Sequence, residues 1–289
     1  MKHSVYFDNC DSRWDNALPM GNGCFGGMLY YEDQLLHMVM NHYEVYHFVR
    51  KNILPEDVRK GYTRPTDKGA AYRRYIDQAD RNQPKAGEPY CYYREDVCDA
   101  FEAEPYGEDS FSSSNPSTGE LIFCFDEKLR DADHNLALYV EDAKILLELN
   151  SAENKLSVET ITARQDCIIN KVTQSHPDLL KRVCVDMRPY RDQDDTEVSF
   201  QQIAPDIFAY TVKRLPQGAE KLFVFSGIIQ LVGAKGSLVE GEKFADIVLE
   251  ETSGEFYILT GIYTQWQHSD TLKSGLETMR QHAAGLEQL

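Results

Sequence analysis

The sequence predicts an all-β protein, a large β-supersandwich of two antiparallel sheets with a short helical insertion and a C-terminal helix. From residue 120 onward, short apolar or alternating runs are separated by Gly, Pro, Asn and Asp, a pattern typical of antiparallel strands. These runs outnumber the roughly ten strands that one open sheet holds, which favours two packed sheets. The composition, 42% hydrophobic and 27% charged, suits a chain that buries a core.

The first third of the chain contains one predicted strand pair and one insertion. Residues 24–30 and 35–40 read as the pair, with Glu32 and Asp33 in the turn. After Pro55 the pattern becomes helical and basic. Residues 83–118 are rich in proline and serine and show no periodicity, which predicts a long surface loop. We therefore expect a sandwich domain over residues 1–268 with an insertion over about 52–118.

The remaining predicted strands follow one another along the second part of the chain. Short loops at 152–154 and 205–206 separate some of them as hairpins. These strands cover residues 121–125, 135–140, 144–149, 155–162, 167–173, 180–186, 197–202, 207–213, 220–226, 245–249 and 255–263.

A single amphipathic helix is predicted for the C-terminal linker, residues 269–289. Ser269 is its expected N-cap, and the apolar stripe consists of Leu272, Leu276, Met279, Ala283 and Leu286. The stripe must be covered by the sheet of this domain, by a second copy of the chain, or by a following domain.

Charge and cysteine usage limit the function classes. Forty-seven acidic and thirty basic side chains give a net charge of -17, which would repel nucleic acid and anionic membranes. The N-terminus lacks the apolar run of a signal peptide, and no stretch is apolar enough to span a membrane. Seven irregularly spaced cysteines indicate free buried thiols in a reducing compartment, so we expect a cytoplasmic protein.

The most informative segment is WDNALPMGNGCFGGMLYY, which starts at Trp14. Gly21, Asn22 and Gly23 tolerate positive φ and predict a sharp turn before a strand. The Gly26-Gly27 pair then allows a close backbone approach within that strand. No Lys-Ser/Thr pair follows, so the segment is not a phosphate-binding loop.

This segment resembles the opening motif of family 95 glycoside hydrolases, the α-L-fucosidase group, which has the form W-x-x-A-L-P-hydrophobic-G-N-G-x-hydrophobic-G-A-M. Asn41, with Glu44 and Tyr46 behind it, resembles the family's Leu-Asn-Glu stretch, although Glu44 is displaced and Tyr46 stands where tryptophan is usual. The strand that begins at Gly119-Glu120-Leu121 and the one near Asp166 resemble later strands of the family. The C-terminal helix resembles the connector to the (α/α)6 catalytic barrel, a domain absent from this sequence.

The resemblance implies a non-catalytic N-terminal sandwich domain of a hydrolase acting on α-L-fucosides or related glycans. Its partners would be an oligosaccharide or glycoside and the catalytic barrel, and the chain alone would be inactive. The candidate residues facing the barrel or the sugar are Trp14, Asn22, Asn41, Glu44 and Tyr92. Because many carboxylate pairs occur by chance among so many acidic side chains, we assign no catalytic residue. We also expect no cofactor.

Two other functions stay open at this stage. One is a stand-alone carbohydrate-binding protein. The other is a mutarotase-like sugar enzyme, by fold analogy alone, since sandwiches of similar shape use a histidine and a carboxylate on the concave face. His37, His42 and His47 recur every fifth residue, but an odd spacing on a strand alternates faces, so we expect no metal site. Aromatic residues such as Trp266 are expected mainly in the core.

Overall fold

The computed structural model describes residues 4–7, 17–45, 47–50, 111–114, 117–163, 167–187, 196–214 and 222–286. Two compact units are present, Met1–His47 with Ser113–Leu289, and Phe48–Ser112. The helical insertion expected after Pro55 and most of the loop expected over 83–118 lie outside the described residues.

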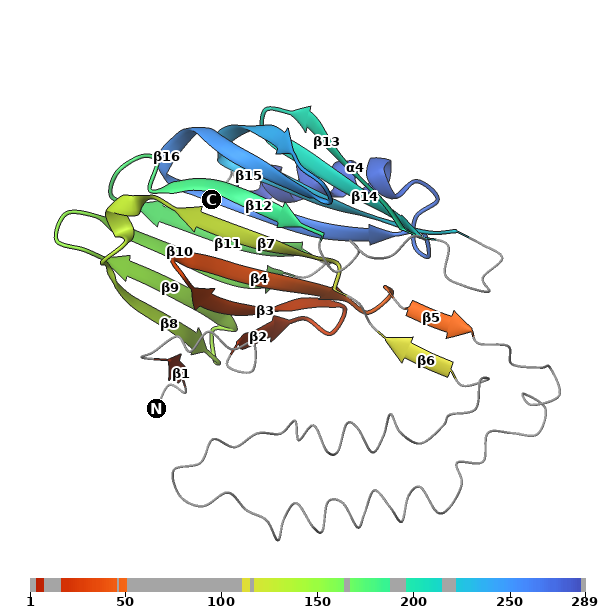
Figure 1. Ribbon diagram of the computed structural model, residues 1–289, viewed down its shortest axis with the longest axis horizontal. Coiled ribbons are helices and arrows are strands. Elements are labelled where there is room, and N and C mark those ends of the chain that lie inside the picture. The colour runs from red at the N-terminus through yellow and green to blue at the C-terminus, as the bar shows by residue number, and fades with distance from the viewer. Residues whose placement is uncertain are drawn as a thin grey trace, which may run out of the picture. The chain divides into compact units, whose positions relative to one another are not determined.

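The first unit is an all-β structure, which confirms the predicted fold class (Figure 1). Its strands form a continuous 14-stranded antiparallel sheet in the order β1-β8-β9-β10-β11-β16-β12-β7-β4-β3-β2, with β13, β14 and β15 branching from β16. The bounds are β1 Ser4–Phe7, β2 Leu18–Gly21, β3 Phe25–Glu32, β4 Leu35–His42, β7 Gly119–Phe125, β8 Asp133–Tyr139, β9 Lys144–Asn150, β10 Lys155–Ala163, β11 Cys167–Gln174, β12 Leu180–Asp186, β13 Thr196–Ala204, β14 Ile207–Arg214, β15 Phe223–Glu240 and β16 Phe244–Thr264.

Two very long strands differ from the sequence prediction. The runs predicted at 245–249 and 255–263 form one strand, β16, and the run predicted at 220–226 continues through the whole of β15. Gly233, Gly236 and the 252–254 segment break the alternation that predicts a strand, but they lie where the β15–β16 register shifts. A bulge there bends both strands without ending them. As a result β16 pairs with β12 through its first half and with β11 through its second.

One hydrophobic core lies between two parts of the sheet, which we call its two arms: the strands β12, β7, β4, β3 and β2 on one side of β16, and the strands β11, β10, β9, β8 and β1 on the other. It gathers Leu36 and Met38 of β4, Phe123 of β7 and, from the other arm, Leu147 of β9 and Val158 of β10. Strand β2, at one end of the strand order, also contacts β9 and β10 without pairing with them. One continuous 14-stranded sheet therefore covers its own apolar face, where the sequence predicted two packed sheets.

The β3–β4 hairpin follows the sequence prediction closely. Leu36, Met38 and Met40 point into the core, so the residues between them point outward. The turn residues are Asp33 and Gln34, one position after the predicted Glu32 and Asp33, with φ of 48° and 65°. Positive φ at both positions is the geometry of a type I′ hairpin turn, whose twist matches the flanking strands.

The second sheet is small. Strands β5 (His47–Arg50) and β6 (Phe111–Ser114) pair with each other in a two-stranded sheet. The end of the expected 83–118 loop is thus a strand, because pairing with β5 satisfies backbone groups that carry no sequence periodicity.

The C-terminal helix α4 (Thr271–Leu286) packs on β15 and β16 (Figure 1). Its fully buried positions are Thr271, Gly275, Met279 and Ala283, spaced one turn apart. Leu272, Leu276 and Leu286 are half-buried and pack against the same apolar cluster. The apolar stripe of the helix is therefore covered by the sheet of this unit. This is one of the three possibilities named from the sequence.

Candidate functional site

The predicted turn around Asn22 connects β2 and β3. The Asn22 side chain holds the turn, because its Oδ1 accepts hydrogen bonds from the backbone N–H groups of Cys24 and Phe25, both at 2.9 Å. Its Nδ2 donates to the Ala163 carbonyl at the end of β10, also at 2.9 Å. Asn22 therefore fastens the turn to a strand 141 residues away.

Glu44, in the turn after β4, lies beside this loop. The Tyr43 hydroxyl and Gln267 Nε2 donate to Glu44 Oε1, each at 2.9 Å, and the Thr264 hydroxyl donates to Oε2. The Tyr43 N–H donates to the Cys24 carbonyl, which joins the two turns. We call Asn22, Tyr43, Glu44, Thr264 and Gln267 the end cluster.

The electrostatics of Glu44 follow from these contacts. Burial raises the pKa of the Glu44 carboxyl, but the hydrogen bonds from Thr264, Gln267 and Tyr43 lower it by more, so the pKa lies below its usual value. A carboxylate that stays ionised and already accepts three hydrogen bonds is poorly suited to donate a proton. The geometry makes Glu44 a tether between the ends of β4 and β16.

Two aromatic side chains are exposed here, Tyr43 of the end cluster and Trp266, which precedes Gln267 in the chain. Trp266 follows β16 and is 66% exposed, and Tyr43 is 41% exposed. The Trp266 ring lies 6.0 Å from that of Phe223, next to Leu222, which is also exposed. The expectation of a core role is wrong for Trp266, because it lies in the turn that leads to α4, outside the strand alternation. An exposed indole can stack on an apolar ligand face.

The other predicted site residues divide into two groups. Asn41 is exposed on the outer face of β4, and its side chain makes no hydrogen bond with the described residues. Trp14 and Tyr92 lie outside the described residues. Of the predicted set, Asn22 and Glu44 are joined through Cys24 and Tyr43, while Asn41 lies two residues before Tyr43 on the outer face.

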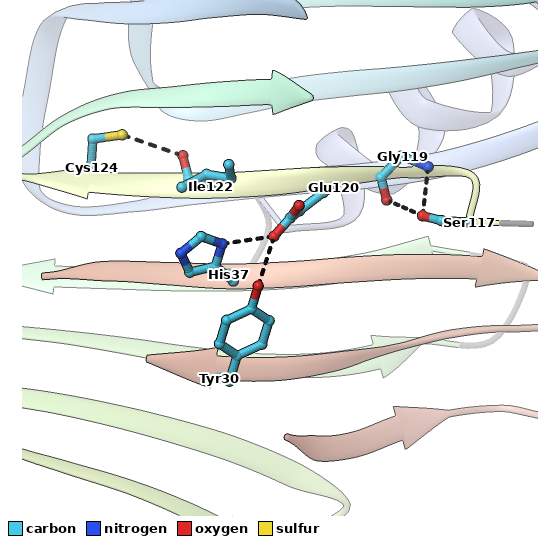
Figure 2. A network of polar contacts seen from close by, with 7 residues as sticks. All are labelled: Tyr30, His37, Ser117, Gly119, Glu120, Ile122 and Cys124. Atoms are coloured by element: carbon cyan, nitrogen blue, oxygen red, sulfur yellow. Dashed lines mark hydrogen bonds and ion pairs between the residues drawn. The ribbon is translucent and has the colours of Figure 1, made fainter. Parts of the chain in front are cut away.

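A second polar group lies on the outer face of β3, β4 and β7 (Figure 2). His37 Nδ1 is 2.7 Å from Glu120 Oε1, and the Tyr30 hydroxyl donates to the same oxygen at 3.3 Å. The Tyr30 and His37 rings are stacked, with centroids 4.5 Å apart and planes 5° from parallel. The sequence contained a signal for this group, since the 37, 39, 41 alternation already placed His37 opposite the core residues.

The histidine spacing does not produce a metal site in the described chain. His37 points outward and His42 is buried in the interior, against Phe25. Among the described residues, no group of three or more His, Cys, Asp or Glu side chains is arranged to hold a metal ion.

The cysteines differ in exposure. Cys124 and Cys167 are buried free thiols, but Cys24 is exposed in the Asn22 turn. Burial raises the pKa of the Cys167 thiol to about 12. Burial, followed by the neighbouring Asp246 carboxylate, also raises the pKa of Cys184 to about 12. The raised pKa values make the Cys167 and Cys184 thiols poor nucleophiles.

Comparison with known proteins gives a structural relative only. No family model matches the sequence, and no curated protein matches it. A solved structure, described as "putative kojibiose phosphorylase from human microbiome", superposes with a TM-score of 0.55 at 9% identity over 99% of this chain. The two share a fold. This chain spans about 35% of the length of that protein.

At this level of identity, the similarity supports the all-β architecture and carries no residue-level correspondence. The specific resemblance to family 95 is not part of this finding. None of the helices in the described residues is long and apolar enough to cross a membrane.

Proposed function

We propose that this chain is the sandwich domain of an enzyme that acts on glycosides, and that it supports a separate catalytic domain. The fold is shared, over nearly the whole chain, with a part of a larger protein described as a "putative kojibiose phosphorylase". Substrates with α-L-fucosyl groups are the first to test, and kojibiose is the comparison substrate.

The observation that carries the proposal is the end cluster with its exposed indole. Trp266 offers an exposed aromatic face, and Gln267, the next residue, is hydrogen-bonded to Glu44. Small-molecule sites commonly combine apolar aromatic surface with a few polar groups. Because both Glu44 oxygens are already hydrogen-bonded, the described end cluster offers binding and support rather than acid catalysis. This agrees with the non-catalytic role.

Tryptophan fluorescence tests the sugar-facing role. The chain has two tryptophans, so a Trp14→Phe variant leaves Trp266 as the sole reporter. We expect its emission to change in a saturable way with methyl α-L-fucoside or kojibiose, and the reciprocal Trp266→Phe variant to lose that response. Unchanged emission with every glycoside tried, from a folded protein, would contradict the sugar-facing role.

The non-catalytic role has its own test. The purified chain is incubated with aryl α-L-fucosides, and with kojibiose plus phosphate, and the released sugar is quantified. We expect no release above the buffer rate. Turnover by this chain alone at the rate of a complete enzyme would overturn the proposal and favour the enzymatic alternative.

A further inference from the structure

The outer face of β3, β4 and β7 carries a histidine whose second ring nitrogen is not used by the described part of the chain. Leu36 and Met38 flank His37 in sequence and point into the core, so His37 points away from it. The side chains of His37 and Glu120 are 12% and 16% exposed. They are therefore mostly covered but still reachable from solvent.

The contacts of the ring fix its orientation. Nδ1 lies 2.7 Å from Glu120 Oε1, and the stacked Tyr30 ring covers one face of the imidazole. A carboxylate has no proton to donate, so the hydrogen bond requires Nδ1 to carry the proton. In the neutral ring, Nε2 is then left with a lone pair, on the side of the ring turned away from Glu120 (Figure 2).

Glu120 is itself positioned by its surroundings. It follows Gly119, whose backbone is held by Ser117, because the Gly119 N–H donates to Ser117 Oγ at 3.1 Å. The Ser117 hydroxyl lies 3.0 Å from the Met40 carbonyl of β4 and 2.9 Å from that of Gly119. The Tyr30 hydroxyl adds a second donor to the Glu120 oxygen that holds the imidazole. These contacts hold the Glu120 carboxylate against the imidazole ring of His37.

We propose that His37 Nε2 is the hydrogen-bond acceptor of a second ligand site, separate from the end cluster, which takes a hydroxyl group of a neutral sugar. The choice of a sugar as the ligand rests on the proposed function. The position of the acceptor rests on the Tyr30–His37–Glu120 geometry alone. Asn41, exposed four residues further along the same face of β4, adds an amide that could contact another hydroxyl.

A metal ion fits this site less well than a hydroxyl group. The described residues hold no third His, Cys, Asp or Glu positioned to complete a metal group with His37 and Glu120. On the neighbouring strands β12 and β16, Arg182 and Asp246 are joined by an ion pair, and Asp186, opposite Glu120, has contacts of its own. His37 Nε2 is a single neutral acceptor, and the Glu120 carboxylate beside it is already hydrogen-bonded, so the site suits one hydroxyl donor.

The tautomer test does not depend on any ligand. We expect nitrogen NMR of the imidazole at about pH 8, well above the usual histidine pKa of about 6.5, to show a proton on Nδ1 of His37. The isosteric Glu120→Gln variant should shift the population toward the Nε2–H form, which histidine prefers in water. A proton on Nε2 in the native protein would overturn the proposal.

The binding test separates this site from the end cluster. Methyl α-L-fucoside and kojibiose are titrated while both the His37 Nε2 resonance and Trp266 fluorescence are recorded. We expect Nε2 to move, and a His37→Asn variant to bind about three- to tenfold more weakly at this site. Asparagine is chosen because its amide N–H can still donate to Glu120, which preserves the contact between β4 and β7.

The outcomes are distinguishable. A response of Trp266 without any movement of Nε2 would overturn the second site and leave the proposed function standing. Movement of Nε2 on addition of Zn²⁺ but not of sugar would replace the hydroxyl ligand with a metal. If the sugar affinity of His37→Asn equals that of the native protein and only its stability falls, the group is structural and the inference fails.

Discussion

Glu44 joins two turns that lie far apart in the sequence, since its partner Thr264 is 220 residues away. Burial raises the pKa of its carboxyl and hydrogen bonding lowers it, and the effect of the hydrogen bonds is the larger. The residues next to Glu44 in the sequence do not indicate that Thr264 and Gln267 bind it. The sequence resemblance therefore identified Glu44 as a candidate but did not predict its role. The structure assigns it a tethering contact.

The lowered pKa of Glu44 predicts a pH-dependent contribution to stability. A carboxyl whose pKa is lower in the folded state stabilises the protein above its unfolded-state pKa, about 4.3, and that contribution disappears as the pH falls through the folded-state pKa. We expect Glu44→Gln to reduce the free energy of unfolding by about 1 kcal/mol at neutral pH, since the site is partly exposed.

Urea unfolding of the native protein and of Glu44→Gln between neutral and acidic pH provides the measurement. The two curves should converge below about pH 4. Glu242→Gln, in the β15–β16 turn, is the matched control because that side chain is exposed. An equal offset between native protein and Glu44→Gln at every pH would show that ionisation of Glu44 is not involved.

Thiol reactivity gives a second test at the residue scale. Cys24 is exposed in the Asn22 turn, whereas burial raises the pKa of Cys167 to about 12. At about pH 8, iodoacetamide should modify Cys24 rapidly and leave Cys167 unmodified in the folded protein. Peptide mass mapping after timed alkylation measures both sites. Modification of Cys167 at the rate of Cys24 would mean that β11 and β16 separate readily.

At the scale of elements, α4 shows how a helix can be attached by small residues. Gly275 faces Tyr263 and Ile228, and a Cβ built on it would lie 2.6 Å and 2.8 Å from atoms of those two side chains. The sequence predicted the helix and its leucine stripe. It did not reveal that the closest approach to the sheet is at a glycine, because glycine is the weakest ordinary helix former.

The two glycines of α4 form a matched pair of tests. Gly275→Ala should lower stability, because overpacking against the sheet costs about 1–3 kcal/mol and exceeds the helix-propensity gain of about 1 kcal/mol. Gly285→Ala should raise stability by up to about 1 kcal/mol, since nothing lies within 4 Å of the added Cβ. Thermal or urea unfolding of both variants checks this. A stabilising Gly275→Ala would mean that α4 can move away from the sheet.

At the scale of the whole molecule, the unit Met1–His47 with Ser113–Leu289 contains every residue of the two described apolar clusters. Its chain is interrupted between β4 and β7, yet these two strands pair directly. Backbone bonds close the junction, since the Thr118 N–H donates to the Met40 carbonyl at 2.9 Å. The parts of the chain before and after residues 48–112 therefore build one core together.

Removal of residues 48–112, with a short Gly/Ser linker in their place, should leave this unit folded. The free energy that holds β4 to β7 comes from contacts within the unit, and a shorter loop costs less closure entropy. We expect unchanged far-UV circular dichroism per residue of the unit and a melting temperature within a few degrees of the native value. Loss of cooperative unfolding would show that the removed segment supplies part of the core.

The sequence by itself determined the all-β class, the pairing of β3 with β4, and the C-terminal helix, because each depends on local periodicity. The structure decided the positive φ of the β3–β4 turn and the helix N-cap, which is Asp270 instead of the predicted Ser269. Only the tertiary structure decided that β15 and β16 run unbroken through both arms of the sheet, where pairing on both sides outweighs the local break at Gly233 and Gly236. The same holds for the end cluster and for the Tyr30–His37–Glu120 group. Their partners come together through strand register between distant segments, and no local pattern encodes that register.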